Sequence, residues 1–202
     1  MEVANRETIF PLKLCLDLSD EQFFQLCQNN RDLGFERTAN GEVIIMPPTG
    51  SDMGNRNGRL IQQLFNWTDT NDLGVAFDSS AGFKLPNGAN RSPDASWIQK
   101  ERWEALTSEE KQQFAPLCPD FVVELRSPSD SLPTLQEKLK EYIANGTRLG
   151  WLIDCQNQGV EVYRPGEEVE IIDTPATLSG ESVLPGFVLD LTPILYEPPS
   201  GA

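Results

Sequence analysis

Short runs of alternating hydrophobic and polar residues indicate that much of the chain forms strands. Two such runs, 35–38 and 42–46, flank Asn40-Gly41, which predicts a hairpin closed by a type I′ turn. The run 121–125 is almost continuously apolar, which favours a strand in the middle of a sheet. Further strands are expected at 75–77, 82–85, 94–98, 149–154, 160–163 and 168–172.

Four helices are predicted from capping residues and from apolar residues at helical spacing. Capping boxes, in which Ser or Thr is followed three positions later by Gln or Glu, occur at Ser19 with Gln22 and at Thr107 with Glu110. Pro133 suits the first turn of a later helix. The apolar stripe of this helix is Leu135, Leu139, Tyr142 and Ile143, and that of the remaining helix is Leu60, Ile61, Leu64, Phe65 and Trp67.

This order of elements combines hairpins with strand–helix–strand units. It predicts an α/β (α+β) fold with a central mixed β-sheet flanked by helices. A chain of 202 residues suits one domain, because hydrophobic cores usually divide only beyond roughly 250–300 residues. We expect an N-terminal arm over 1–18, a single domain over 19–195 and a frayed tail over 196–202.

The sequence shows no sign of export or of a membrane segment. Its first residues lack a basic start followed by an apolar run, and no stretch approaches the ~18 apolar residues of a membrane span. The cysteines are widely spaced and form no C-x-x-C pair, so we interpret them as reduced thiols. We therefore expect a cytoplasmic protein without a membrane partner. The cysteines are Cys15, Cys27, Cys118 and Cys155.

The amino-acid composition limits which catalytic groups the protein can use. The chain contains no histidine, which excludes Ser-His-Asp and Cys-His catalysis and any His-ligated metal site. Proton transfer is left to carboxylates, Lys, Arg, Tyr or bound water. The formal net charge is −15, but the segment 56–148 is nearly balanced, so most of the excess acid lies in the flanks. A lone chain is expected to bind nucleic acid only weakly, because phosphate contacts need Lys and Arg.

Two carboxylates on predicted strands stand out. Asp94 follows Pro93 at the start of one strand, and Glu124 interrupts the apolar run of another. Alternation places Glu124 and Arg126 on the same face of their strand. If the two strands are neighbours, Asp94 and Glu124 can share one divalent cation, which removes the repulsion between two buried anions. Mg²⁺ prefers such oxygen ligands and retains several waters, one of which can attack a phosphate.

The pattern Pro93-Asp94 followed by Glu124-Leu125-Arg126 resembles the PD-(D/E)XK nuclease motif, with arginine where lysine is usual. Three longer blocks resemble the Uma-two family of restriction-endonuclease-like proteins (domain of unknown function eight-twenty), and the likeness spans residues 20–195. These blocks are MPPTG at 46–50, PDFVVELRSPS at 119–129, and Lys138 through Tyr142 with Gly146 and GWLID at 150–154.

The resemblance implies a restriction-endonuclease-like core and a Mg²⁺-dependent endonuclease, with Mn²⁺ as a substitute, that hydrolyses DNA phosphodiester bonds with an activated water. It assigns the metal to Asp94 and Glu124. Arg126 occupies the lysine position of the motif, and Lys138 on the next helix is a substitute cation for catalysis and phosphate binding. Because a single small domain cuts one strand at a time, double-strand cleavage would require a homodimer.

A third carboxylate of the metal site is expected from the hairpin, from Glu42 or from Glu36, and Gln136 is a weaker candidate for the pocket. Simpler interpretations stay open for the individual residues. Glu124 can form an ion pair with Arg126 or with Lys138 instead of binding a metal. Lys138 can equally be a solvated helix residue. Surface positions are expected for Asp120, Glu137 and Glu141.

Two other functions compete with the nuclease. The first is a catalytically inactive nuclease-fold module that serves in protein interactions, which the arginine at the lysine position and the acidic composition keep open. The second is a glycosidase that uses Asp94 and Glu124 as acid and base, although no aromatic platform for a sugar accompanies them.

Overall fold

A computed structural model describes residues 11–196. The outer part of the expected arm (1–10) and most of the expected frayed tail (197–202) lie outside the described residues. Within residues 11–196 no helix has both the length and the apolar composition needed to cross a membrane.

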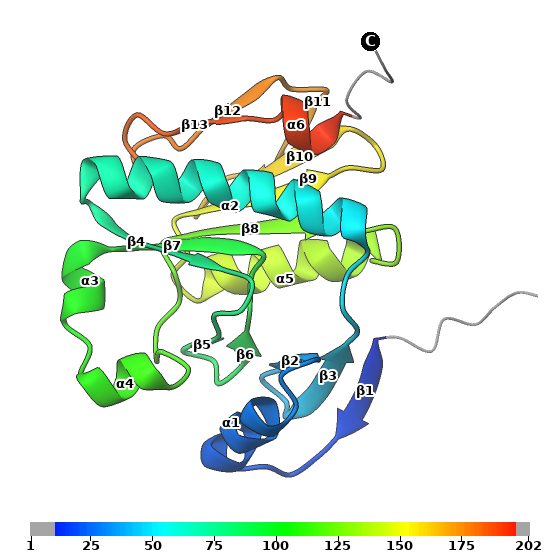
Figure 1. Cartoon of the computed structure of the whole chain (residues 1–202), viewed down its shortest axis with the longest axis vertical. Coiled ribbons are helices and arrows are strands. Elements are labelled where there is room, and N and C mark those ends of the chain that lie inside the picture. Colours follow the sequence, from blue (N-terminus) through cyan, green and yellow to red (C-terminus); the bar gives the residue numbers. More distant parts are fainter. Residues whose placement is uncertain (1–10, 197–202) are drawn as a thin grey trace, which may run out of the picture.

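A six-stranded mixed sheet forms the centre of the fold (Figure 1). Within it β8 and β9 are parallel, and every other neighbouring pair is antiparallel. The fold class predicted from the sequence is therefore confirmed. In spatial order the strands are β11 (Glu170–Asp173), β10 (Gly159–Tyr163), β9 (Leu149–Asp154), β8 (Phe121–Arg126), β7 (Ala95–Gln99) and β4 (Gly74–Asp78).

Helices α2 (Ser51–Asn71) and α5 (Leu132–Ala144) cover opposite faces of this sheet (Figure 1). The reason lies in the apolar strand β8, whose alternate side chains face both ways. Phe121, Val123 and Leu125 belong to the same core cluster as Leu60 and Leu64 of α2. Val122 packs on the other face in a cluster that includes Leu139 and Tyr142 of α5. A polar side chain at position 124 is therefore directed toward α5.

A second, smaller sheet lies on the α5 side of the large sheet (Figure 1). Helix α1 (Asp20–Asn29) packs on it through a cluster of Phe23, Phe35 and Val43. Residues 12–15, within the expected arm, form a strand of this sheet and pair with 42–45. In spatial order its strands are β1 (Leu12–Cys15), β3 (Glu42–Met46), β2 (Gly34–Arg37), β6 (Asn90–Arg91) and β5 (Phe83–Lys84).

The remaining elements are short. Both predicted capping boxes are present, at Ser19 before α1 and at Thr107 before the short helix that begins at Ser108. Pro133 stands in the first turn of α5, as predicted. The short elements are α3 (Lys100–Glu104), α4 (Ser108–Gln112), β12 (Thr177–Ser179), β13 (Val188–Asp190) and α6 (Thr192–Leu195).

The predicted hairpin is confirmed, but its predicted turn type is wrong. A type I′ turn needs a positive φ at both central residues. Gly41 has a φ of 85°, whereas Asn40 does not have a positive φ. The Gly41 N–H donates to the Thr38 carbonyl at 2.9 Å, and the Thr38 N–H donates to the Glu42 carbonyl at 2.9 Å. The connection is thus a longer loop in which glycine takes the one left-handed position.

Candidate active site

The antiparallel pairing of β7 with β8 brings Asp94 and Glu124 together. Ala95 pairs with Val123, so the preceding residue, Asp94, stands opposite the following residue, Glu124. The Oδ2 atom of Asp94 accepts a hydrogen bond from the Leu125 backbone N–H at 2.7 Å. This bond fixes the Asp94 carboxylate against the end of β8, beside the Glu124 side chain.

Helix α5 supplies the partners of Glu124. The Lys138 Nζ lies 2.8 Å from the Glu124 Oε1, and the Tyr142 hydroxyl donates to the same oxygen at 3.1 Å. Lys138 and Tyr142 are four residues apart, which places them on one face of the helix. The ion pair between Glu124 and Lys138, the simpler interpretation of Glu124, is therefore present, and the interpretation of Lys138 as a solvated residue is wrong, because its side chain is only 11% exposed. Glu124 is only 3% exposed.

Glu36 of β2, rather than Glu42, supplies the third carboxylate of this cluster. Its Oε1 lies 2.7 Å from the Lys138 Nζ, so one ammonium group bridges Glu36 and Glu124. Glu42 lies on β3, opposite Cys15 of β1, and its carboxylate is 3.8 Å from Lys13. The order β1-β3-β2-β6 explains the difference, because β2 stands between β3 and the strand that leads to Asp94.

Burial and charge together set the protonation of the cluster. Burial raises the pKa of Asp94 to about 6, against the opposing effects of the Leu125 N–H and of Lys138. Burial also raises the pKa of Glu124, and the charges of Asp94 and Glu36 act in the same direction. Burial alone would lower the pKa of Lys138, but the carboxylates of Glu124 and Glu36 raise it above its ordinary value. Lys138 therefore stays a cation.

Arg126 does not join Glu124. It ends β8, and its Nη1 lies 2.7 Å from the Asp154 Oδ2 on β9. The two residues are direct neighbours in the parallel register of β8 and β9. The strand end directs the guanidinium toward β9, so Lys138 is the cation that contacts Glu124.

The donor set fits a hard divalent cation. Among the described residues no donor reaches the Oδ1 of Asp94 or the Oε2 of Glu124, so each carboxylate keeps one oxygen for a ligand. Residues 11–196 contain no group of three His, Cys, Asp or Glu side chains arranged to hold a metal ion. Mg²⁺ does not need such a cage, because it binds through one or two carboxylates and retains water.

Several acidic and amide side chains lie elsewhere than expected from the sequence. The surface interpretation is wrong for Asp120, which is 2% exposed and whose Oδ1 lies 2.8 Å from Arg102. It is also wrong for Glu141, whose carboxylate accepts from the Arg91 Nε at 2.6 Å. Gln136 donates to the buried Glu161 at 2.7 Å and is absent from the cluster.

Arg91 and Tyr142 complete the cluster and were not among the residues proposed from the sequence. Arg91 contacts both Glu36 and Glu141, and Tyr142 contacts Glu124. A weak signal existed for each residue. Arg91 precedes the Pro93-Asp94 pair, and Tyr142 follows Lys138 at helical spacing.

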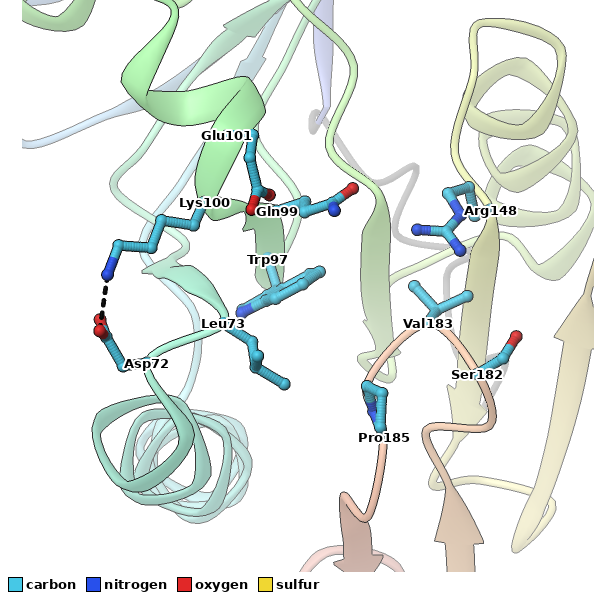
Figure 2. A pocket seen from close by; sticks show the side chains of 10 residues that line it. All are labelled: Asp72, Leu73, Trp97, Gln99, Lys100, Glu101, Arg148, Ser182, Val183 and Pro185. Carbon is cyan, nitrogen blue, oxygen red and sulfur yellow. Dashed lines mark hydrogen bonds and ion pairs between the residues drawn. The ribbon is translucent and has the colours of Figure 1, made fainter.

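A cavity of about 250 Å³ lies at the other end of β7 (Figure 2). It is lined in part by Trp97, Arg148 and Val183, and at its rim Lys100 pairs with Asp72 at 2.6 Å. None of the carboxylates or cations of the cluster lines it. The candidate site is thus the charged cluster around Glu124, between the two sheets and α5.

Comparisons with known proteins identify the family of the chain and relate its fold to a solved structure. A family model, Uma2, described as "Putative restriction endonuclease", matches residues 20–192. A solved structure described as a putative nuclease belonging to DUF820 from Anabaena variabilis ATCC 29413 is similar to the chain with a TM-score of 0.71 and 21% sequence identity. The likeness covers 88% of this chain and 97% of that one. No curated protein matches the chain. The chain belongs to the Uma2 family of putative restriction endonucleases.

Proposed function

We propose that the protein is a Mg²⁺-dependent endonuclease that hydrolyses DNA phosphodiester bonds at the site formed by Asp94, Glu124 and Lys138. One observation carries this proposal. Two carboxylates on adjacent strands stand opposite each other, each with one oxygen free, beside a buried lysine that stays charged. Family membership supports a nuclease. A homodimer would provide the two sites that double-strand cleavage requires.

The residues of the cluster would have separate roles in binding the cation and the phosphate. The Leu125 N–H and the Tyr142 hydroxyl orient the Asp94 and Glu124 carboxylates, whose free oxygens would hold the cation. When bound, Mg²⁺ would activate a water and stabilise charge on the phosphate. The Lys138 ammonium adds a fixed positive charge beside Glu124, where it would stabilise negative charge that develops on the phosphate. Arg126, whose side chain is 15% exposed, would contact the DNA backbone at the rim.

Supercoiled plasmid provides the test of this function. We expect the purified chain to nick or linearise plasmid in Mg²⁺ or Mn²⁺ and to stop when EDTA is added. Asp94→Asn keeps the shape of the side chain and its contact with the Leu125 N–H, but removes the charge, so it should be inactive. Equal cleavage by wild type and Asp94→Asn would point to a contaminating nuclease and would contradict the proposal.

Metal binding should depend on pH through Asp94. Because its pKa is raised to about 6, the carboxylate is neutral below that pH and must lose a proton before it can bind a cation. The affinity for Mg²⁺ should therefore rise at least about fivefold between pH 5 and pH 6, as expected for one coupled proton. The raised pKa of Glu124 acts with the same sign. Calorimetry across this range measures the effect, and a constant affinity would contradict it.

Arg126→Lys should retain cleavage within about threefold of wild type. Arg126 contacts Asp154 through one nitrogen, which a lysine ammonium can replace, and it does not contact Glu124. Initial rates of plasmid nicking at saturating Mg²⁺ measure this. If the nicking rate of the folded variant falls by about a hundredfold or more, the guanidinium must act on the phosphate in a way that lysine cannot reproduce.

A catalytically inactive interaction module is the second candidate function. Lys138 forms ion pairs with Glu36 and Glu124, and Arg91 forms a further one with Glu36, so the cluster can also serve as a structural element without a metal. The two functions differ in metal binding. A folded wild-type chain that shows no heat of Mg²⁺ or Mn²⁺ binding at pH 8 would favour the inactive module.

A further inference from the structure

Glu36 reaches the candidate site from outside the large sheet. It lies on β2 of the smaller sheet and is 3% exposed. Its Oε1 is 2.7 Å from the Lys138 Nζ and accepts from the Ser92 backbone N–H at 3.1 Å. Its Oε2 accepts from the Arg91 Nη1 at 3.0 Å. Each oxygen of this buried carboxylate therefore has a donor from the protein.

The presence of a donor on both oxygens distinguishes Glu36 from the other two carboxylates. Glu124 accepts both of its hydrogen bonds on Oε1, and Asp94 accepts its bond on Oδ2. A cation ligand needs a free lone pair directed at the metal. A cation at Glu36 would have to share an oxygen with Lys138 or Arg91, whereas Asp94 and Glu124 each offer an oxygen without a donor among the described residues. Glu36 is thus placed to act on Lys138 rather than on a metal.

Arg91 anchors Glu36 from the neighbouring strand. Arg37 of β2 pairs with Asn90 of β6, so the adjacent positions, Glu36 and Arg91, also face each other across the two strands. The Arg91 Nε also lies 2.6 Å from the Glu141 Oε2 on α5. Arg91 therefore ties the smaller sheet to the helix that carries Lys138, and this fixes the distance between Glu36 and the Lys138 ammonium.

We propose that Glu36 is a positioning residue for the metal site, and this inference rests on the proposed function. It shares the Lys138 ammonium with Glu124 and so prevents that ammonium from pairing with Glu124 alone. Arg91 holds Glu36 in place. When the charge of Glu36 is lost, Lys138 pairs fully with Glu124 and opposes a second cation at the same carboxylate. The smaller sheet thereby sets the affinity of the site in the larger sheet.

Titration calorimetry with Mn²⁺ tests this inference through a double-variant cycle. The chains compared are wild type, Glu36→Gln, Lys138→Met and the double variant, with Glu42→Gln as the matched control from the same hairpin. We expect Glu36→Gln to weaken Mn²⁺ binding about tenfold, as outer contacts of metal ligands do. In the Lys138→Met background the same change should have an effect of less than about threefold, because Arg91 still neutralises Glu36. Glu42→Gln should bind as wild type does.

The Glu36→Gln variant should also recover cleavage when Mn²⁺ is raised to saturation, which a merely misfolded variant would not do. If Glu36→Gln weakens Mn²⁺ binding equally with and without Lys138, Glu36 is a direct ligand and the inference is overturned. An unchanged Mn²⁺ affinity in Glu36→Gln would also overturn it, because Glu36 would then have no effect on the site. If Lys138→Met does not fold, Lys138→Gln takes its place in the cycle. Absence of Mn²⁺ binding by wild type would refute the proposed function itself. If wild type binds Mn²⁺ but the effects of the Glu36 and Lys138 substitutions are independent, only the inference about Glu36 fails.

Discussion

Glu124→Gln is expected to lower DNA cleavage by on the order of 10³-fold or more, while the fold stays intact. The change keeps the shape of the side chain and the hydrogen bond from Tyr142, but it removes the negative charge that would hold the cation. A divalent cation supplies several kcal/mol of transition-state stabilisation, and about 4 kcal/mol corresponds to this factor. Initial rates of plasmid nicking in Mg²⁺ measure the loss.

Glu161→Gln is the matched control for this variant. Glu161 is also a buried carboxylate of the large sheet, on β10, but it contacts Gln136 and Tyr163 and takes no part in the cluster. It should cleave at nearly the wild-type rate. The account is contradicted if Glu124→Gln is folded and active, or if both substitutions reduce cleavage equally.

Lys138→Met should lower the free energy of unfolding by about 3–5 kcal/mol, the usual cost of breaking a buried ion pair from one side. The change leaves Glu36 and Glu124 without the ammonium that contacts both of them. Urea unfolding at pH 8 measures the difference. The loss should shrink as the pH falls, because Glu124, whose pKa is already raised, can then take up a proton and become neutral.

Lys140→Met provides the control two residues away on the same helix. Lys140 pairs with Glu137 on the surface, where both side chains are more than half exposed, so its replacement should change stability by less than about 0.5 kcal/mol. Mg²⁺ should also stabilise Lys138→Met more than it stabilises wild type, since the cation can neutralise the buried charge of Glu124 that the substitution leaves unpaired. Equal stability of the two lysine variants would show that the Lys138 ion pairs are energetically unimportant.

The sequence predicts those parts of the site that depend on local pattern. Glu124 is visible because a charge interrupts an apolar strand, and Asp94 is visible because it follows proline at the start of another. The predicted stripe of α5 places Lys138 next to the buried face of that helix, and the structure brings its ammonium to Glu124. Alternation along β8 also predicts that both of its faces are covered. In the structure α2 covers one face and α5 covers the other.

The parts that the sequence could not settle depend on contacts between distant segments. Whether Glu36 or Glu42 joins the cluster is decided by the strand order of the smaller sheet, in which β2 lies next to the two-residue strand β6. So short a strand has no periodicity to detect. The partner of Arg126 is Asp154, and this pair follows only from the parallel register of β8 with β9. The burial of Asp120 likewise depends on Arg102 and on the Gln99 N–H.

The central claim is that Asp94 and Glu124 hold one divalent cation between their free oxygens. Anomalous diffraction from a crystal grown with Mn²⁺ tests it most directly. The account predicts one strong peak per chain, within about 2.5 Å of the Asp94 Oδ1 and of the Glu124 Oε2, with Glu36 still bound to Lys138. A peak ligated by Glu36 or Glu42 in place of these oxygens, or a well-ordered cluster without any peak at saturating Mn²⁺, would contradict it.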